Sequence, residues 1–132
     1  MGKFLFYDID GTLMGKSKKV TEKTKWAIEQ AQKNGHKAFL CTGRAPTSIS
    51  DDLKEIPFDG IICSAGGFVI IDNEFIFENF MNQYILSEVM TLFINNHILF
   101  TLETKDALYQ TPGVNEFFDQ KHLKDCENNL EL

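Results

Sequence analysis

Basic residues, paired cysteines and long apolar runs are all scarce in this 132-residue sequence. With 13 Lys and Arg against 19 Asp and Glu, the net charge of −6 argues against a general nucleic-acid binder. The three cysteines are odd in number and lack metal-ligand spacing, which indicates reduced thiols in a cytoplasmic protein. Cys41 and Cys63 follow apolar runs and are expected to be buried, whereas Cys126 lies in polar sequence. No apolar run could cross a membrane, and Asp8 interrupts the first too early for a signal peptide.

Apolar side chains, in contrast, are abundant, and 43% apolar with 12% aromatic content is enough for one modest core. Charge is unevenly distributed: residues 1–55 carry 10 Lys and Arg against 7 Asp and Glu, and residues 56–132 carry 3 against 12. The basic excess could lie near an anion site or could be ordinary solvated helix surface. The three histidines are scattered singly, so we expect them to be surface or packing residues.

Short apolar runs alternate with helical patterns in the first half, which predicts an α/β fold with a Rossmann-like parallel sheet. A helix is expected over residues 22–34, because Thr21 suits an N-cap and Gly35 ends the pattern. A shorter helix is expected to begin at Pro46 and to reach Ile56. The three expected strands are residues 3–9, 37–41 and 60–63.

After Cys63 the pattern becomes that of an α+β segment. A hairpin is expected around the polar pair Asp72-Asn73, followed by a helix over residues 83–95. Two further strands joined by a polar turn are expected next. The chain then ends in an acidic stretch that is either a helix or a frayed tail. The paired segments are residues 68–71 with 75–77 and residues 98–102 with 108–111, and the final stretch is 115–132.

The most informative feature is an apolar strand that ends in two carboxylates, Asp8 and Asp10. In an extended chain alternate side chains share a face, so both carboxylates can point to one side, where one can attack a substrate while the other moves protons. Gly11 permits a sharp turn, and Thr12 offers a hydroxyl and an N–H to an anion. The simpler alternative is a strand that leaves the core through a polar turn.

The ends of the next two strands carry further candidate residues. Thr42, Gly43 and Arg44 follow the second strand and lead to the expected Pro46 helix, a combination suited to binding phosphate. Alone, these three residues also fit an ordinary strand-to-helix loop. The Ser64–Gly66 loop after the third strand fits either a structural turn or a substrate contact.

The signature Asp-Ile-Asp-Gly-Thr at residues 8–12 resembles the nucleophile motif of the haloacid dehalogenase (HAD) superfamily, and the loop that begins at Thr42 resembles its second motif. The loop after the third strand resembles that of the superfamily's Cof-like phosphatases. The resemblance implies a Mg²⁺-dependent phosphohydrolase acting on small phosphorylated metabolites such as sugar phosphates. It makes Asp8 the nucleophile that forms an aspartyl phosphate and Asp10 the general acid and base, with both also holding Mg²⁺. The implied phosphate-binding residues are Gly11, Thr12, Thr42, Gly43 and Arg44.

The sequence departs from that family pattern in three respects. Ala65 stands where the family usually has Asn, and neither the family's lysine motif nor its Gly-Asp-x-x-x-Asp motif has a match. A complete member is roughly twice as long, so we expect an N-terminal portion, with half of the core in residues 1–66 and a partial cap in 67–132. In the family's order the first strand is central, and here a neighbour is missing. We therefore expect an open strand edge and either self-association or a partner that supplies the missing half.

Two other functions fit parts of the sequence. The unmatched motifs favour a catalytically inactive fragment that acts as a binding or assembly module. A phosphoacceptor receiver domain also uses an aspartyl phosphate, but it places its acceptor after the third strand, where this chain has Cys63 and Ser64.

Overall fold

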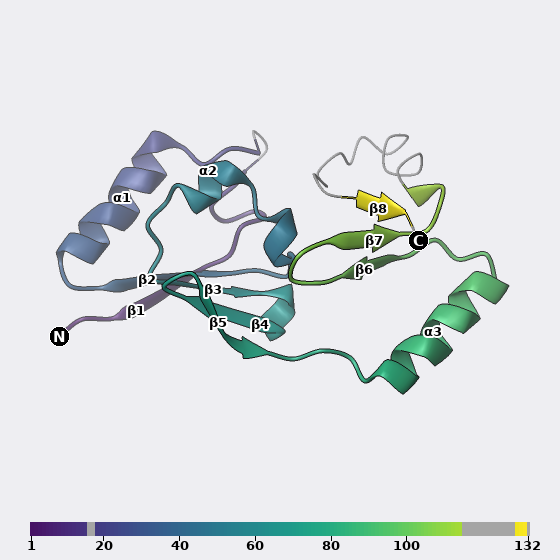
Figure 1. Ribbon diagram of the computed structural model, residues 1–132. Helices are drawn as coiled ribbons and strands as arrows, with labels where there is room; N and C mark the ends of the chain where they lie inside the picture. Colours follow the sequence, from purple (N-terminus) through teal and green to yellow (C-terminus); the bar gives the residue numbers. More distant parts are fainter. Residues whose placement is uncertain (16–17, 115–128, 132) are drawn as a thin grey trace. The chain divides into compact units, whose positions relative to one another are not determined.

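The computed structural model describes residues 1–15, 18–114 and 129–131. The chain divides into two compact units, Met1–Arg44 with Ile49–Glu78 and Ala45–Ser48 with Asn79–Leu132, which are described separately (Figure 1). Cys126 and most of the expected 115–132 helix or tail lie outside the described residues.

The first unit is built on a five-stranded sheet in which the first three strands are parallel and the last two antiparallel. Its order follows the sequence, so the first strand lies at one edge. The predicted β-α-β-α-β order and the α/β fold class are confirmed. The strands are β1 (Phe4–Tyr7), β2 (Lys37–Cys41), β3 (Gly60–Cys63), β4 (Phe68–Ile71) and β5 (Glu74–Glu78).

Helix α1 (Glu22–Lys33) confirms the first predicted helix. The Thr21 hydroxyl accepts the backbone N–H of Thr24 at 3.2 Å, which satisfies one of the free donors of the first turn. Gly35, just beyond the helix, has a φ of +82°, a conformation that glycine adopts without steric cost.

The second predicted helix is wrong as a continuous element. A 3-10 turn at Pro46–Ser48 is followed by the four-residue α2 (Asp51–Lys54). The break lies at Ser50, which has extended backbone angles and donates its hydroxyl to the Asp52 carboxylate at 2.6 Å. Serine side chains favour such local bonds at helix starts, so a new helix begins here instead of continuing the turn. The α-helix N-terminus expected to bind phosphate at Pro46 is replaced by this three-residue 3-10 turn.

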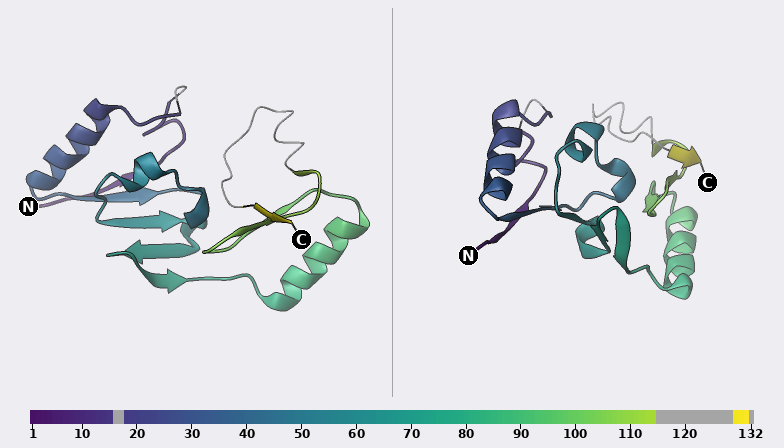
Figure 2. Two further views of the ribbon diagram at one scale, coloured as in Figure 1. Left: turned by 45° about the horizontal axis from the view of Figure 1, so that its top comes forward. Right: turned by 60° about the vertical axis from the view of Figure 1, so that its left-hand side comes forward.

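Helices α1 and α2 lie over the same face of the sheet (Figures 1 and 2). Their side chains Ile28 and Leu53 pack with Ala38, Leu40 and Cys63 in one buried cluster. Burial of this cluster away from water is the main stabilising contribution to the unit.

Among the described residues of this unit, no helix lies on the opposite face of the sheet (Figure 2). The strand register and the alternation of side chains assign a second set of residues to this face. Phe4 and Phe6 are 67% and 58% exposed, and the ring of Phe6 stacks on that of Phe39 with centroids 5.3 Å apart. We call this set the open face: Phe4, Phe6, Phe39, Cys41, Ile62, Val69 and Phe77.

The predicted hairpin is confirmed as β4 and β5, with Asp72 and Asn73 both at positive φ in the turn. Because β4 hydrogen-bonds to β3, the hairpin belongs to the first unit, which continues to Glu78. The first unit therefore ends after the boundary expected between residues 66 and 67. The assignment of residues 1–66 to the core and 67–132 to a cap stays a prediction.

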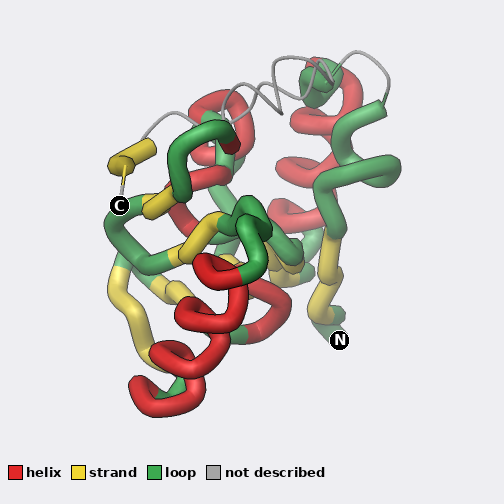
Figure 3. Tube along the Cα trace, turned by 90° about the vertical axis from the view of Figure 1, so that its right-hand side faces the viewer, coloured by secondary structure: helices red, strands yellow, loops and turns green. Residues whose placement is uncertain are grey.

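The second unit contains α3 (Gln83–Asn95), which has the predicted bounds and is capped by the Asn82 side chain. In the Cα trace of Figure 3, α3 is drawn as a red coil. The two expected strands form an antiparallel pair and are shorter than predicted, and a third strand pairs in parallel with the second of them. In the described ranges no helix is long and apolar enough to span a membrane. The strands are β6 (Thr101–Glu103), β7 (Leu108–Gln110) and β8 (Asn129–Glu131).

Candidate active site

The two candidate carboxylates lie just beyond the carboxyl end of β1. Ile9 is fully buried, whereas Asp8 and Asp10 on either side of it are exposed. This is the alternation that the sequence predicts. Gly11 then adopts a φ of +83°, and the chain turns back so that the N–H of Met14 donates to the carbonyl of Ile9 at 2.9 Å.

The turn after β1 uses two of the N–H groups expected to bind phosphate. Gly11 donates to the carbonyl of Met14 at 2.9 Å, and Thr12 donates to the carbonyl of Ile9 at 3.3 Å. A phosphate would have to share or replace these bonds, while the exposed Thr12 hydroxyl remains an alternative contact. The phosphate-binding role of both residues stays a prediction.

The Thr42-Gly43-Arg44 loop begins directly after β2, beside the end of β1. Thr42 is buried, and its backbone N–H donates to the carbonyl of Ile62 at 2.9 Å. Its hydroxyl accepts the N–H of Arg44 at 3.1 Å, so the buried threonine fixes the loop. In the described chain, no acceptor within hydrogen-bond distance takes the N–H of Gly43, which is exposed at the strand end.

Arg44 brings the two strand ends together by binding Asp10 through two hydrogen bonds. Its Nε donates to Oδ2 at 3.0 Å and its Nη2 donates to Oδ1 at 2.7 Å. These hydrogen bonds from Arg44 hold the pKa of Asp10 below its ordinary value, although partial burial acts in the opposite direction. The sequence predicted that Arg44 binds phosphate, whereas in the structure its guanidinium binds Asp10, the candidate general acid and base.

The loop after β3 supports Arg44, a role that sequence reasoning missed. The N–H of Ser64 donates to the carbonyl of Arg44 at 2.8 Å, and the N–H of Ala65 donates to that of Thr42 at 3.2 Å. Ser64, Ala65 and Gly66 all have positive φ, at 49°, 52° and 94°. The glycine is the sequence signal for this turn. The two preceding residues adopt a conformation that costs non-glycine residues free energy.

Asp8 differs from Asp10 in having no ionic partner. Within the described residues its carboxylate makes no hydrogen bond or ion pair, and the carbonyl oxygen of Asp10 accepts no hydrogen bond. Two free oxygens of this kind suit Mg²⁺, which binds one or two carboxylates and takes its other ligands from water and phosphate. The described ranges contain no group of three or more His, Cys, Asp or Glu that could hold a metal ion unaided.

The two described cysteines differ from each other. Cys63 is buried as predicted, and burial raises the pKa of its thiol to about 11, which leaves it unreactive. The prediction for Cys41 is wrong, because this residue is exposed. It pairs with Ile62 and so belongs to the open face, where no helix of the unit covers it.

Comparison with known proteins identifies the family of this chain. A sequence profile of the haloacid dehalogenase-like hydrolases matches residues 5–131. The chain belongs to this family. The predicted HAD superfamily and its Cof-like subgroup are confirmed.

The relatives of this HAD chain include two proteins of Bacillus subtilis (strain 168). It is 34% identical to the putative phosphatase YkrA over 77 residues, which are 58% of this chain and 30% of that protein. It is 29% identical to the putative phosphatase YxeH over 125 residues, 93% of this chain and 42% of that protein. Among solved structures, the HAD subclass IIB sugar phosphatase BT4131 matches with a TM-score of 0.77 at 22% identity, over 99% of this chain and 53% of that one. The chain thus spans about half the length of its relatives, or less.

Proposed function

We propose that this chain carries the nucleophile half of a HAD-type phosphohydrolase that works through an aspartyl phosphate. The observation that carries the proposal is the contrast between two neighbouring carboxylates at the end of β1. Asp8 is exposed and unpaired in the described chain, whereas Asp10 is held on both oxygens by Arg44. An unpaired carboxylate suits nucleophilic attack, and an oriented one suits proton transfer.

In the proposed reaction an oxygen of Asp8 attacks the substrate phosphorus in line with the leaving oxygen. The Asp8–phosphorus bond forms as the bond to the leaving group breaks, and Asp10 gives a proton to the departing oxygen. The pair with Arg44 keeps Asp10 ionised, so this step requires that the substrate phosphate first draws Arg44 away and lets Asp10 take up a proton. Water then attacks the aspartyl phosphate, Asp10 takes a proton from that water, and inorganic phosphate leaves with Asp8 restored. The Thr42 hydroxyl and the N–H of Gly43 would stabilise charge on the transferring phosphoryl oxygens.

Mg²⁺ is the proposed cofactor, held by the Asp8 carboxylate and the Asp10 carbonyl. When bound it would supply positive charge that offsets the repulsion between carboxylate and phosphate. Its ligand set would be completed by water and substrate oxygens, since Mg²⁺ prefers six oxygens in octahedral geometry.

The proposed substrates are small phosphorylated metabolites of the sugar-phosphate kind, handled in the cytoplasm. Support for this class comes from the resemblance in sequence and from a relative of the same fold described as a sugar phosphatase. Because the chain spans only part of its relatives, we expect feeble hydrolysis of p-nitrophenyl phosphate by the 132-residue polypeptide.

The proposal can be tested without turnover by using beryllium fluoride, which forms a tetrahedral complex that mimics an aspartyl phosphate. ¹⁹F NMR of the full chain with Mg²⁺ and beryllium fluoride should show a bound signal. The signal should vanish in Asp8→Asn and persist in Asp106→Asn, which changes an exposed aspartate of the second unit. An unaltered signal in Asp8→Asn, or no signal in the unmodified chain, would contradict the nucleophile assignment.

A second candidate function is a catalytically inactive binding or assembly module. The observation that favours it is the open face, on which large apolar side chains lie uncovered by helices of the first unit. Self-association or a partner that supplies a missing half are the two forms that this function would take.

A further inference from the structure

Aspartate or asparagine precedes glycine at three places in this chain. The pairs are Asp10-Gly11, Asn34-Gly35 and Asp59-Gly60, and Asn34 is the one asparagine in the sequence that glycine follows. Glycine has no side chain to shield its backbone nitrogen, so this nitrogen can attack the carbonyl carbon of the preceding side chain. Which of the three pairs can react depends on how the fold holds each side chain.

The fold restrains both aspartates of these pairs. Arg44 binds the two oxygens of Asp10, at 3.0 and 2.7 Å. The oxygens of Asp59 accept hydrogen bonds of 2.6, 2.9 and 2.9 Å, and the adjoining Gly60 is buried. Neither carboxylate can turn towards the next backbone nitrogen without breaking these bonds.

Asn34 is not restrained in this way. It lies in the turn between α1 and β2, where both Asn34 and Gly35 are exposed. Within the described chain its side-chain amide makes no hydrogen bond. A Cβ atom added at Gly35 would meet no atom within 4 Å beyond the adjoining residues, so there is space for a ring at this position.

The end of α1 restrains the attacking nitrogen instead. The N–H of Gly35 donates to the carbonyl of Gln32 at 2.8 Å, and the N–H of His36 donates to that of Ala31 at 3.1 Å. These are the two hydrogen bonds of a Schellman motif. The Gly35 nitrogen can attack only when the last turn of α1 opens, and helix ends open at a fraction of the free energy of global unfolding.

We propose that Asn34 is a deamidation site of the folded chain, with a rate set by the opening of the last turn of α1. The Gly35 nitrogen forms a bond to the side-chain carbonyl carbon of Asn34. Ammonia leaves from that carbon and carries away the proton of the Gly35 N–H. Water then opens the resulting succinimide ring at either carbonyl, which leaves aspartate or isoaspartate at residue 34. Water is the single co-reactant.

The modification should loosen the first unit. A carboxylate at the C-terminus of α1 is repelled by the negative end of the helix dipole. Isoaspartate also adds a carbon to the main chain inside the Schellman motif, so the bonds from Gly35 and His36 are lost. Gln32, whose amide binds Asp59, lies in the same turn. The chain with isoaspartate should unfold at a lower urea concentration than Asn34→Asp, which carries the charge alone.

Peptide mapping by mass spectrometry after incubation of the full chain at mildly alkaline pH tests the site. We expect Asn34 to convert at least tenfold faster than Asn73, which is also exposed in a turn but is followed by Glu74. A urea-unfolded sample gives the rate without the fold, and the folded chain should convert more slowly but measurably. Conversion no faster than at Asn73, or none in the folded chain when the unfolded sample has converted fully, would overturn the proposal.

The role of the last turn has a test of its own. Gln32→Ala removes the side chain that ties this turn to Asp59, so the folded chain should deamidate at Asn34 at least threefold faster while the unfolded rate is unchanged. Gln30→Ala is the matched control, because the Gln30 side chain lies on the same helix and makes no hydrogen bond in the described chain. Equal rates in the two variants would overturn the proposed dependence on helix opening.

Discussion

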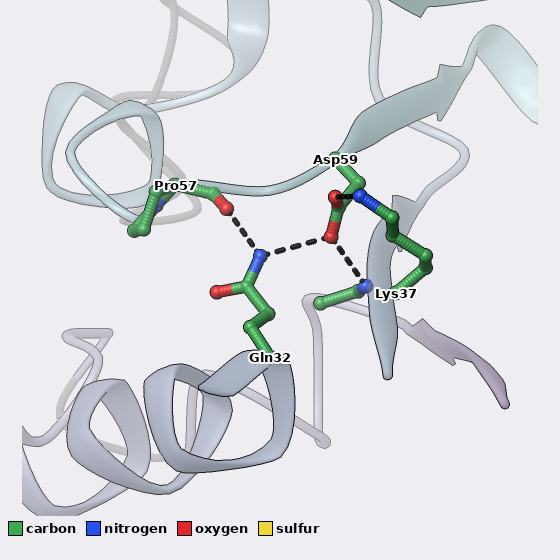
Figure 4. Close-up of polar contacts among 5 residues, drawn as sticks. Gln32, Lys37, Pro57 and Asp59 are labelled. Carbon is green, nitrogen blue, oxygen red and sulfur yellow. Dashed lines mark hydrogen bonds and ion pairs between the residues drawn. The ribbon is translucent and has the colours of Figure 1, made fainter. Parts of the chain in front are cut away.

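The ammonium of Lys37 donates to the carboxylate of Asp59 at 2.6 Å and ties the start of β2 to the segment before β3 (Figure 4). The other oxygen of Asp59 accepts the backbone N–H of Ala38 and the side-chain amide of Gln32, each at 2.9 Å. The same amide reaches the carbonyl of Pro57 at 2.6 Å. One carboxylate therefore joins α1, β2 and the entry to β3 at the amino end of the parallel strands, opposite the candidate active site.

Asp59 should make the stability of the first unit depend on pH. Burial acts to raise the pKa of Asp59, but the hydrogen bonds from Lys37, Gln32 and Ala38 outweigh it and lower the pKa to about 2. The unfolded value is near 3.9, so the stabilisation is complete above that pH and is lost as pH falls towards 2. Asp59→Asn should lower the free energy of unfolding by about 1–3 kcal/mol at neutral pH.

Urea unfolding of the unmodified chain and of Asp59→Asn at pH 7, 4 and 2.5 measures this effect. The difference between the two proteins should shrink steadily below pH 4. A difference that is constant from pH 7 to 2.5 would show that the charge of Asp59 contributes nothing.

Arg44→Gln should raise the pKa of Asp10, because the guanidinium hydrogen bonds are what hold it below its ordinary value. ¹³C NMR titration of the aspartate carboxyl groups measures the change. Lys37→Gln removes a comparable cation from Asp59 and serves as the control, since it should shift Asp59 and leave Asp10 unaffected. If the pKa of Asp10 is the same in the Arg44→Gln variant as in the unmodified chain, the ion pair between Arg44 and Asp10 does not persist in solution.

Ala65→Gly should stabilise the chain, because Ala65 has a φ of 52° and its exposed methyl group packs little. The left-handed conformation costs a non-glycine residue about 1–2 kcal/mol, part of which is offset by the greater chain entropy of unfolded glycine. A gain of about 0.5–1 kcal/mol is expected from thermal or urea unfolding.

The same substitution at the exposed helical residue Ala27 should have the opposite sign and cost about 1 kcal/mol. If both glycine variants destabilise the chain equally, Ala65 is not strained.

Local signals were sufficient to predict most elements of this fold. Strands β2 and β3 and helix α3 have the predicted bounds, because each is a short apolar run or a periodic pattern between clear turn residues. The break at Ser50 was missed, since the apolar spacing of Ile49, Leu53 and Ile56 fits a continuous helix equally well. All three side chains lie in the core.

Pairings between distant residues were harder to predict. The contact of Arg44 with Asp10 joins residues 34 apart, and a sequence motif does not state which of two anions an arginine binds. The exposure of Cys41 depends on which face of the sheet receives the helices. The periodicity of a strand shows which side chains share a face of the sheet, but it does not show which face the helices cover.

The position of β1 also bears on how firmly the candidate residues are held. An edge strand opens at a lower free energy than a central one, because separating it from the sheet breaks hydrogen bonds on one side only. Asp8 and Asp10 follow this strand directly, so each local opening of β1 would displace them from Thr42 and Arg44. Any neighbour that paired with the second side of β1 would lengthen the lifetime of the assembled site without touching a single one of its side chains.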